Sequence, residues 1–176
     1  MGSGRYSIPI SLSHPPQHSF TSEQKKMVNT IVVPDNYGYV ALSAFSMAWL
    51  NVFQSRLVGN KRKAAGVAYP QMYAEKDQQE ASKDAFVFNC AQRAHSNTLE
   101  WLPTVLFALL FTGLRYPLFA AGAGTAITIG RGLYTVGYVN YGPGGRNLIG
   151  GMVGHMASMA LYAGGTWSAI KMIMGQ

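Results

Sequence analysis

Three polar residues in an apolar stretch of the chain have side chains that could bind a small charged molecule. Arg93, Asn97 and Glu100 are spaced at i, i+4 and i+7, which places them on one face if the stretch is helical. A guanidinium binds a carboxylate through two parallel N–H donors, an amide donates or accepts, and a carboxylate accepts from an ammonium group. This combination predicts a site for a zwitterionic acid.

A second polar stripe occupies another apolar stretch. Arg131, Tyr134 and Tyr138 fall at i, i+3 and i+7, again on one helical face. Their guanidinium and hydroxyl groups can donate hydrogen bonds to an anion. Because ionisable side chains at membrane depth are costly, Arg93, Glu100 and Arg131 are candidate functional residues rather than ordinary packing residues.

Four apolar blocks, residues 37–58, 85–114, 118–139 and 148–174, are predicted to form the helices that position these stripes. The first is long enough, at about 1.5 Å per residue, to cross a hydrocarbon core of about 30 Å. Turns at 115–117 and 140–147 and a polar link at 59–84 join the blocks. Residues 1–34 are interpreted as a flexible polar tail, and residues 35–176 as an all-α, integral membrane four-helix bundle.

The composition supports a membrane protein. Hydrophobic residues make up 48% of the chain and charged residues only 12%, where a soluble domain has about 25% charged residues. The net charge of +7 could suggest nucleic-acid binding, but Arg93, Arg131 and Arg146 lie in or beside apolar blocks, so none is predicted. A soluble bundle of buried helices is the alternative, although four such blocks would leave few polar faces for water.

The distribution of lysine and arginine indicates which helix ends meet. The side that holds the 59–84 link carries more of these residues than the other side, which favours a cytoplasmic link. In an up-and-down bundle the end of the first helix, the start of the second and the end of the third share that face. Both stripes and two further arginines are then expected to converge: Arg62, Arg93, Asn97, Glu100, Arg131, Tyr134, Tyr138 and Arg146.

An internal salt bridge, Arg93 or Arg131 with Glu100, is the alternative to a ligand site. Several arginines face this single carboxylate, so pairing within the bundle leaves positive charge unmatched. An anionic ligand is therefore predicted, with an opening to the bilayer for a lipophilic second reactant. No His, Cys and carboxylate cluster has the spacing of a metal site, and no metal is predicted.

Small residues at helical spacing in the third and fourth blocks predict close packing between helices. Cys90 is interpreted as a packing residue and His155 as the donor or acceptor of an interhelical hydrogen bond. The small residues are Gly122, Ala126 and Gly130 in one block and Gly150, Gly154 and Ser158 in the other.

Three sequence motifs resemble those of a known family, the membrane-associated proteins in eicosanoid and glutathione metabolism (MAPEG), and within it the microsomal glutathione transferases of the third type. The motifs are VAYPQMY at 67–73, FNCAQRAHSNTLE at 88–100 and RGLYTVGY at 131–138, and the resemblance covers residues 37–176. It implies a four-helix homotrimer in the endoplasmic reticulum membrane, with the outer mitochondrial membrane as the alternative. It also implies glutathione as co-substrate, bound between neighbouring subunits.

The same resemblance implies roles for individual residues. Arg146 matches the arginine that activates the glutathione thiol, and Tyr138 is the second candidate catalytic residue. Trp101 stands where the leukotriene-forming relatives have a tyrosine. The positions matched to glutathione binding are Arg62, Arg93, Asn97, Glu100, Arg131, Tyr134 and Tyr138.

These roles predict an enzyme that makes glutathione reactive. A thiol with a pKa of about 8.5 is mostly protonated at neutral pH, so an adjacent guanidinium that favours the thiolate raises the nucleophilic fraction. The thiolate would attack a lipophilic electrophile or reduce a lipid hydroperoxide. The alternatives are a non-catalytic lipid-binding scaffold of the same family and a small-solute channel, which would need a polar stripe through the full membrane depth.

Overall fold

The computed structural model describes residues 33–147 and 150–176, and all regular secondary structure in this part of the chain is helical, as predicted for the fold class. The prediction of a flexible tail at residues 1–34 falls almost entirely outside the described residues. The described residues contain four long helices, one short helix and one 3₁₀ helix: α2 (Tyr37–Ala65), α3 (Lys76–Ala81), α4 (Lys83–Gly113), α5 (Pro117–Tyr141), η1 (Pro143–Asn147) and α6 (Gly151–Ile173).

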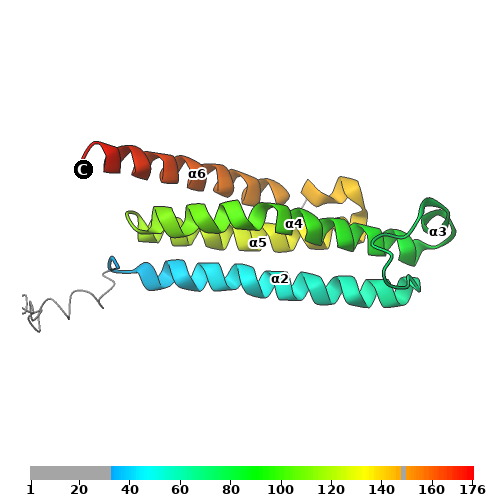
Figure 1. Cartoon of the computed structure of the whole chain (residues 1–176). Helices are drawn as coiled ribbons and strands as arrows, with labels where there is room; N and C mark the ends of the chain where they lie inside the picture. Colours follow the sequence, from blue (N-terminus) through cyan, green and yellow to red (C-terminus); the bar gives the residue numbers. More distant parts are fainter. Residues whose placement is uncertain (1–32, 148–149) are drawn as a thin grey trace, which may run out of the picture. The chain divides into compact units, whose positions relative to one another are not determined.

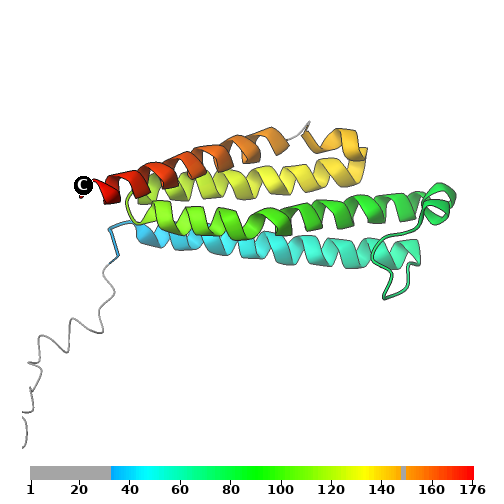
Figure 2. The same ribbon diagram turned by 45° about the horizontal axis from the view of Figure 1, so that its top comes forward.

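The four long helices run side by side, with successive helices antiparallel (Figure 1). Helix α2 packs along both α4 and α5, while α6 packs on α5 and, less extensively, on α4. Figure 2 shows the end of α2, the start of α4, and the end of α5 with η1 at one end of this bundle. The expected convergence of these three helix ends is therefore present.

The first helix is longer than the sequence analysis predicted. Helix α2 continues through Lys61, Arg62 and Lys63 to Ala65, so residues 59–65 are helical and do not belong to the link. It stops at Gly66, which adopts the left-handed conformation (φ 66°) and donates its N–H to the last turn. The prediction was wrong because charged residues make a segment polar without breaking a helix, whereas a left-handed glycine ends one.

Helices α5 and α6 approach closely at two of the predicted small residues. A Cβ added to Gly130 would lie only 2.5 Å from the backbone nitrogen of Gly154, so only glycine fits there. The prediction of close packing is confirmed at this pair. It fails at Gly122, where an added Cβ would meet nothing within 4 Å.

The core between the helices is not purely apolar. Val40, Leu109 and Leu161 are fully buried, but so are the polar side chains of Gln54 and Thr135.

No helix within residues 33–147 and 150–176 combines the length and the apolar content that crossing a membrane requires, in contrast to the prediction of four transmembrane helices.

Because α5 and α6 touch at Gly130, alanine substitutions at two glycines of α5 should have different effects on the stability of the protein. Gly130→Ala should destabilise the protein by about 1–3 kcal/mol, because the new methyl group must push the two backbones apart. Gly132→Ala is the matched control: its Cβ would meet only Leu50 Cδ1, at 3.8 Å, so the better helix former should be neutral or stabilising. Thermal unfolding in detergent measures both, and equal midpoints for the two variants would contradict the close contact.

Candidate functional site

The stripe on α4 forms an ion pair that is open to its surroundings. Arg93 Nη1 lies 2.7 Å from Glu100 Oε1, and Asn97 Nδ2 donates to the other carboxylate oxygen at 3.3 Å. The Arg93 and Glu100 side chains are 46% and 52% exposed. This is the salt bridge that the sequence analysis offered as an alternative to a ligand site. Its exposure leaves both charges accessible to a ligand that could bind to them directly.

Arg131 on α5 carries a second positive charge, which is buried. It is 7% exposed, and its Nη2 donates to Asn97 Oδ1 and to Thr98 Oγ1, each at 2.9 Å. Its guanidinium also lies over the rings of Tyr134, at 4.4 Å, and Trp101, at 5.4 Å. Within the described part of the chain, the ion pairs do not include Arg131. Its direct hydrogen-bond partners are therefore neutral, and the nearby Glu100 carboxylate is already paired with Arg93.

A fully buried glutamine on α2 fixes the partners of Arg131. Gln54 Nε2 donates to Thr98 Oγ1 at 2.9 Å and to Thr135 Oγ1 at 2.7 Å. Thr98 donates in turn to the Ala94 carbonyl, so its single hydrogen and both lone pairs are in use. Thr135 donates to the carbonyl of Arg131 itself at 2.9 Å. One side chain thus ties α2, α4 and α5 together at the depth of the charged residues.

The two tyrosines of the α5 stripe continue from Arg131 toward the end of the helix. Tyr134 and Tyr138 are both 9% exposed, and their rings meet edge to face with centroids 5.7 Å apart. They pack against Cys90 and Ala94 of α4. Cys90 is buried, which agrees with its interpretation as a packing residue.

A hollow opens beside this cluster, where the start of α6 crosses α4 and α5. It is bounded on one side by the charged and aromatic residues just described and on the other by the first turns of α6. The lining residues are Asn97, Trp101, Arg131, Tyr134, Asn147, Gly151, Met152 and His155. The His155 ring packs against Trp101 of α4, with centroids 5.2 Å apart, where the sequence analysis predicted a hydrogen bond.

Arg62 lies in a different environment from the rest of the predicted site. Its Nη1 donates to the Gln71 carbonyl at 2.6 Å, and its guanidinium is sandwiched between the rings of Tyr69 and Phe88. These contacts hold the loop after α2 against α4. The structure therefore gives Arg62 a role in loop structure and does not place it in the Arg131 network.

Arg146 lies on η1, close to the hollow but outside its lining. Its side chain is exposed, and Nη1 donates to the Pro143 carbonyl at 3.0 Å. Its neighbour Asn147 lines the hollow, and Gly145 packs against Gly137 of α5, so η1 is held on the end of that helix. The predicted set thus forms one connected group of Arg93, Asn97, Glu100, Arg131, Tyr134 and Tyr138, with Arg146 at its edge.

Comparison with known families connects this group to a family. The MAPEG family model matches residues 40–167, which are most of the chain. The chain belongs to the MAPEG family. As a MAPEG protein it shares the membrane and glutathione-related character of that family, and all of the helical residues described for the site lie within the matched range.

Sequence reasoning missed two residues of this MAPEG site. Gln54 is a polar residue within the apolar 37–58 block, and that contrast alone could have marked it as buried and hydrogen-bonded. His155 was interpreted only as a helix contact, because nothing in its spacing shows that the start of α6 turns toward Arg131.

Replacing Gln54 should destabilise the folded protein at the site. Gln54→Leu keeps the volume but removes two buried hydrogen bonds, so the free energy of unfolding should fall by about 1–3 kcal/mol. Ser55→Ala, at the next and exposed position of α2, is the control and should have little effect. Chemical denaturation in detergent measures both. If Gln54→Leu unfolds with the same midpoint as the control, the network does not hold the three helices together.

Proposed function

We propose that this MAPEG protein is a membrane-bound glutathione transferase and peroxidase of the branch formed by the microsomal transferases of the third type. Glutathione carries two carboxylates, one ammonium group and one thiol. The connected group offers guanidinium donors at Arg93 and Arg131 for the carboxylates and the Glu100 carboxylate for the ammonium group. The charges of site and ligand are therefore complementary.

The observation that carries the proposal is the unmatched charge of Arg131. A buried guanidinium with only neutral partners is costly, because its attraction to hydrogen-bond acceptors does not replace full hydration. The cost is reduced if an anion binds beside it, and the hollow lined by Arg131 and Tyr134 has room on that side. Arg62 is left out of the proposed binding set because its guanidinium is buried against the loop.

Activation of the thiol is assigned to Arg146, with Tyr138 as the second catalytic candidate. A guanidinium near the sulfur favours the thiolate, which is the nucleophilic form. Arg146 is exposed on η1 beside the hollow, so its side chain is free to turn toward a bound thiol. The thiolate then attacks an electrophilic carbon in a conjugation or an oxygen of a hydroperoxide in a reduction.

The outer surface of the bundle supports a lipophilic second substrate and a membrane location. Many large apolar side chains are exposed on the long helices, in addition to the apolar residues of the core, which is more exposed apolar surface than a protein in water usually carries. The exposed residues include Leu42, Phe45, Trp49, Phe107 and Met156. We propose that this surface contacts lipid and neighbouring subunits in a homotrimer of the endoplasmic reticulum membrane.

The test is to purify the full chain in detergent, titrate it with glutathione, and assay conjugation of chlorodinitrobenzene and reduction of cumene hydroperoxide. Saturable glutathione binding with turnover of at least one substrate is the expected result. Binding without turnover would favour a lipid-binding scaffold of the same family. No binding of glutathione would overturn the proposal.

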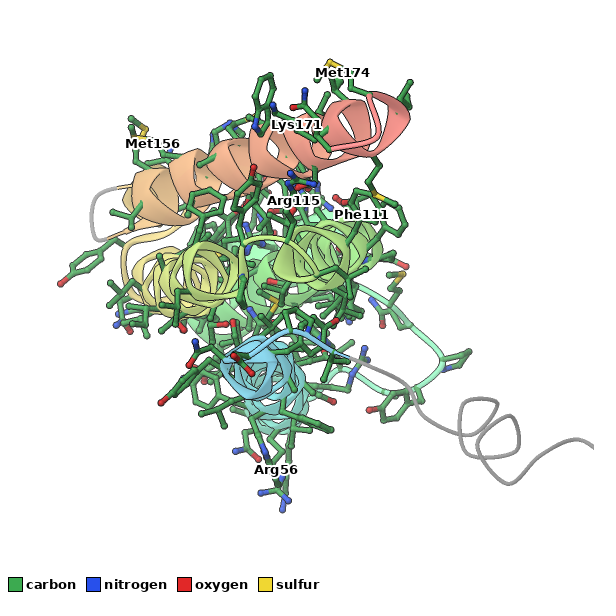
Figure 3. The ribbon with its side chains drawn as sticks, turned by 90° about the vertical axis from the view of Figure 1, so that its left-hand side faces the viewer. Arg56, Phe111, Arg115, Met156, Lys171 and Met174 are labelled. Atoms are coloured by element: carbon green, nitrogen blue, oxygen red, sulfur yellow. The ribbon has the colours of Figure 1, made fainter. Side chains whose placement is uncertain are left out.

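Arg146→Ala should separate chemistry from binding. Turnover should fall by about a hundredfold, as when one donor to a negative charge is removed, while the affinity for glutathione changes little. The thiolate absorbs far-ultraviolet light more strongly than the thiol does, so a difference spectrum of bound glutathione should show less thiolate at neutral pH. Arg56→Ala is the control, because Arg56 points away from the bundle on α2 (Figure 3). Wild-type turnover and an unchanged thiolate spectrum in Arg146→Ala would contradict the assignment.

A further inference from the structure

One titratable side chain of the hollow has no role in glutathione binding or in thiol activation. His155 lies on the second turn of α6, across the hollow from Asn97, Arg131 and Tyr134. Its side chain is exposed, and its ring packs at a tilt against Trp101, with the ring centroids 5.2 Å apart. The ring is thus fixed at the wall of the site while its polar nitrogens remain available to a ligand.

The position of His155 is set by close contacts of the glycines that precede it on α6. The adjacent Gly154 touches Gly130, the residue before Arg131, so closely that a Cβ on Gly130 has no room. One turn earlier, a Cβ on Gly151 would lie 3.1 Å from Tyr134 Cδ2. Because glycines let the two helices meet at the backbone, His155 is held beside Arg131 and Tyr134 without relying on a flexible loop.

We propose that His155 is the proton donor for the hydroperoxide branch of the reaction. The inference rests on the proposed function. Other polar groups of the hollow are less suited to this step: arginine stays charged, asparagine does not titrate, and a phenol holds its proton more tightly. Imidazole is the side chain that most often acts as a general acid in enzyme sites. His155 therefore supplies the acid that reduction of a hydroperoxide needs and that conjugation of an aromatic chloride does not.

The need for a proton follows from the leaving groups. In hydroperoxide reduction the thiolate sulfur attacks the terminal oxygen, the S–O bond forms, and the O–O bond breaks. The sulfur is oxidised to a sulfenic acid, and the alkoxide that leaves takes a proton from the imidazolium of His155. Water returns a proton to the imidazole, which balances the proton that the thiol released. A second glutathione then converts the sulfenic acid to a disulfide and water.

Conjugation of chlorodinitrobenzene does not need this acid. The thiolate sulfur forms a bond to a carbon of the aromatic ring, and chloride leaves as a stable anion. No proton is therefore transferred to the leaving group. The two substrates share the site, the glutathione and the thiolate. Loss of the proton donor should therefore slow only the reduction of the hydroperoxide and leave the conjugation rate unchanged.

The experiment compares the full-length protein with His155→Phe, which keeps an aromatic ring against Trp101 but cannot donate a proton. Met156→Leu, at the next and exposed position of α6, is the matched control. For each protein, kcat/KM is measured with cumene hydroperoxide and with chlorodinitrobenzene, and the thiolate spectrum of bound glutathione is recorded. In His155→Phe, kcat/KM with cumene hydroperoxide should fall by about a hundredfold, which is the contribution of a general acid. With chlorodinitrobenzene, kcat/KM should fall by less than about twofold. The thiolate signal of bound glutathione should also change by less than about twofold.

Each other outcome decides against the inference. Equal losses with both substrates, or a weaker thiolate spectrum, would show that His155 supports the glutathione site instead. Unchanged hydroperoxide reduction in His155→Phe would show that another group donates the proton. If the unmodified protein conjugates but reduces no hydroperoxide, the inference fails and the transferase function stands. If it binds no glutathione, the proposed function fails and the inference with it.

Discussion

Arg131 brings a positive charge into the interior of the bundle, and the surrounding side chains are arranged to hold it. Thr98 and Asn97 accept its hydrogen bonds, Tyr134 covers its face, and Gln54 fixes Thr98 from a third helix. None of these partners carries a negative charge. In a protein that binds nothing here, a buried apolar residue would be the more stable choice. The arrangement makes sense if stability is given up for a site that is ready for an anion.

The same constraint explains how the helices are ordered. Gln54 must reach both α4 and α5, so α2 packs into the groove between them, and its helical end brings Arg62 onto the loop that closes this end of the bundle. On the opposite side of α5, Gly130 lets α6 approach closely enough to form the wall of the hollow. The interior of the bundle therefore combines an apolar core with a polar layer around Arg131, while many large apolar side chains lie on its outer surface.

The four long helices, their order and the two polar stripes could be predicted from the sequence, because apolar runs and helical spacing are local properties. The short helix α3 was missed, since it lies in the polar segment predicted as a link. The stripes Arg93–Asn97–Glu100 and Arg131–Tyr134–Tyr138 do meet, and the topology was sufficient to expect this. The loop role of Arg62 and the approach of His155 to Arg131 could not be predicted, since each depends on contacts between residues distant in the sequence. The end of α2 at Gly66 was missed for a local reason, because the charged residues before this glycine were interpreted as part of the link. Spacing identifies the face of a helix, but it does not identify the residue opposite that face.

The central claim is that the buried charge of Arg131 exists to bind the glutathione anion, and ligand-induced stabilisation tests it most directly. A ligand that binds only the folded protein raises its stability by RT ln(1 + [L]/Kd), which is about 2.7 kcal/mol at a hundred times Kd. Thermal unfolding of the wild-type protein and of Arg131→Met is followed in detergent as glutathione is added. The account predicts that the midpoint rises with glutathione in the wild type and stays constant in Arg131→Met, while the variant without ligand remains folded. An equal rise in both proteins would contradict it.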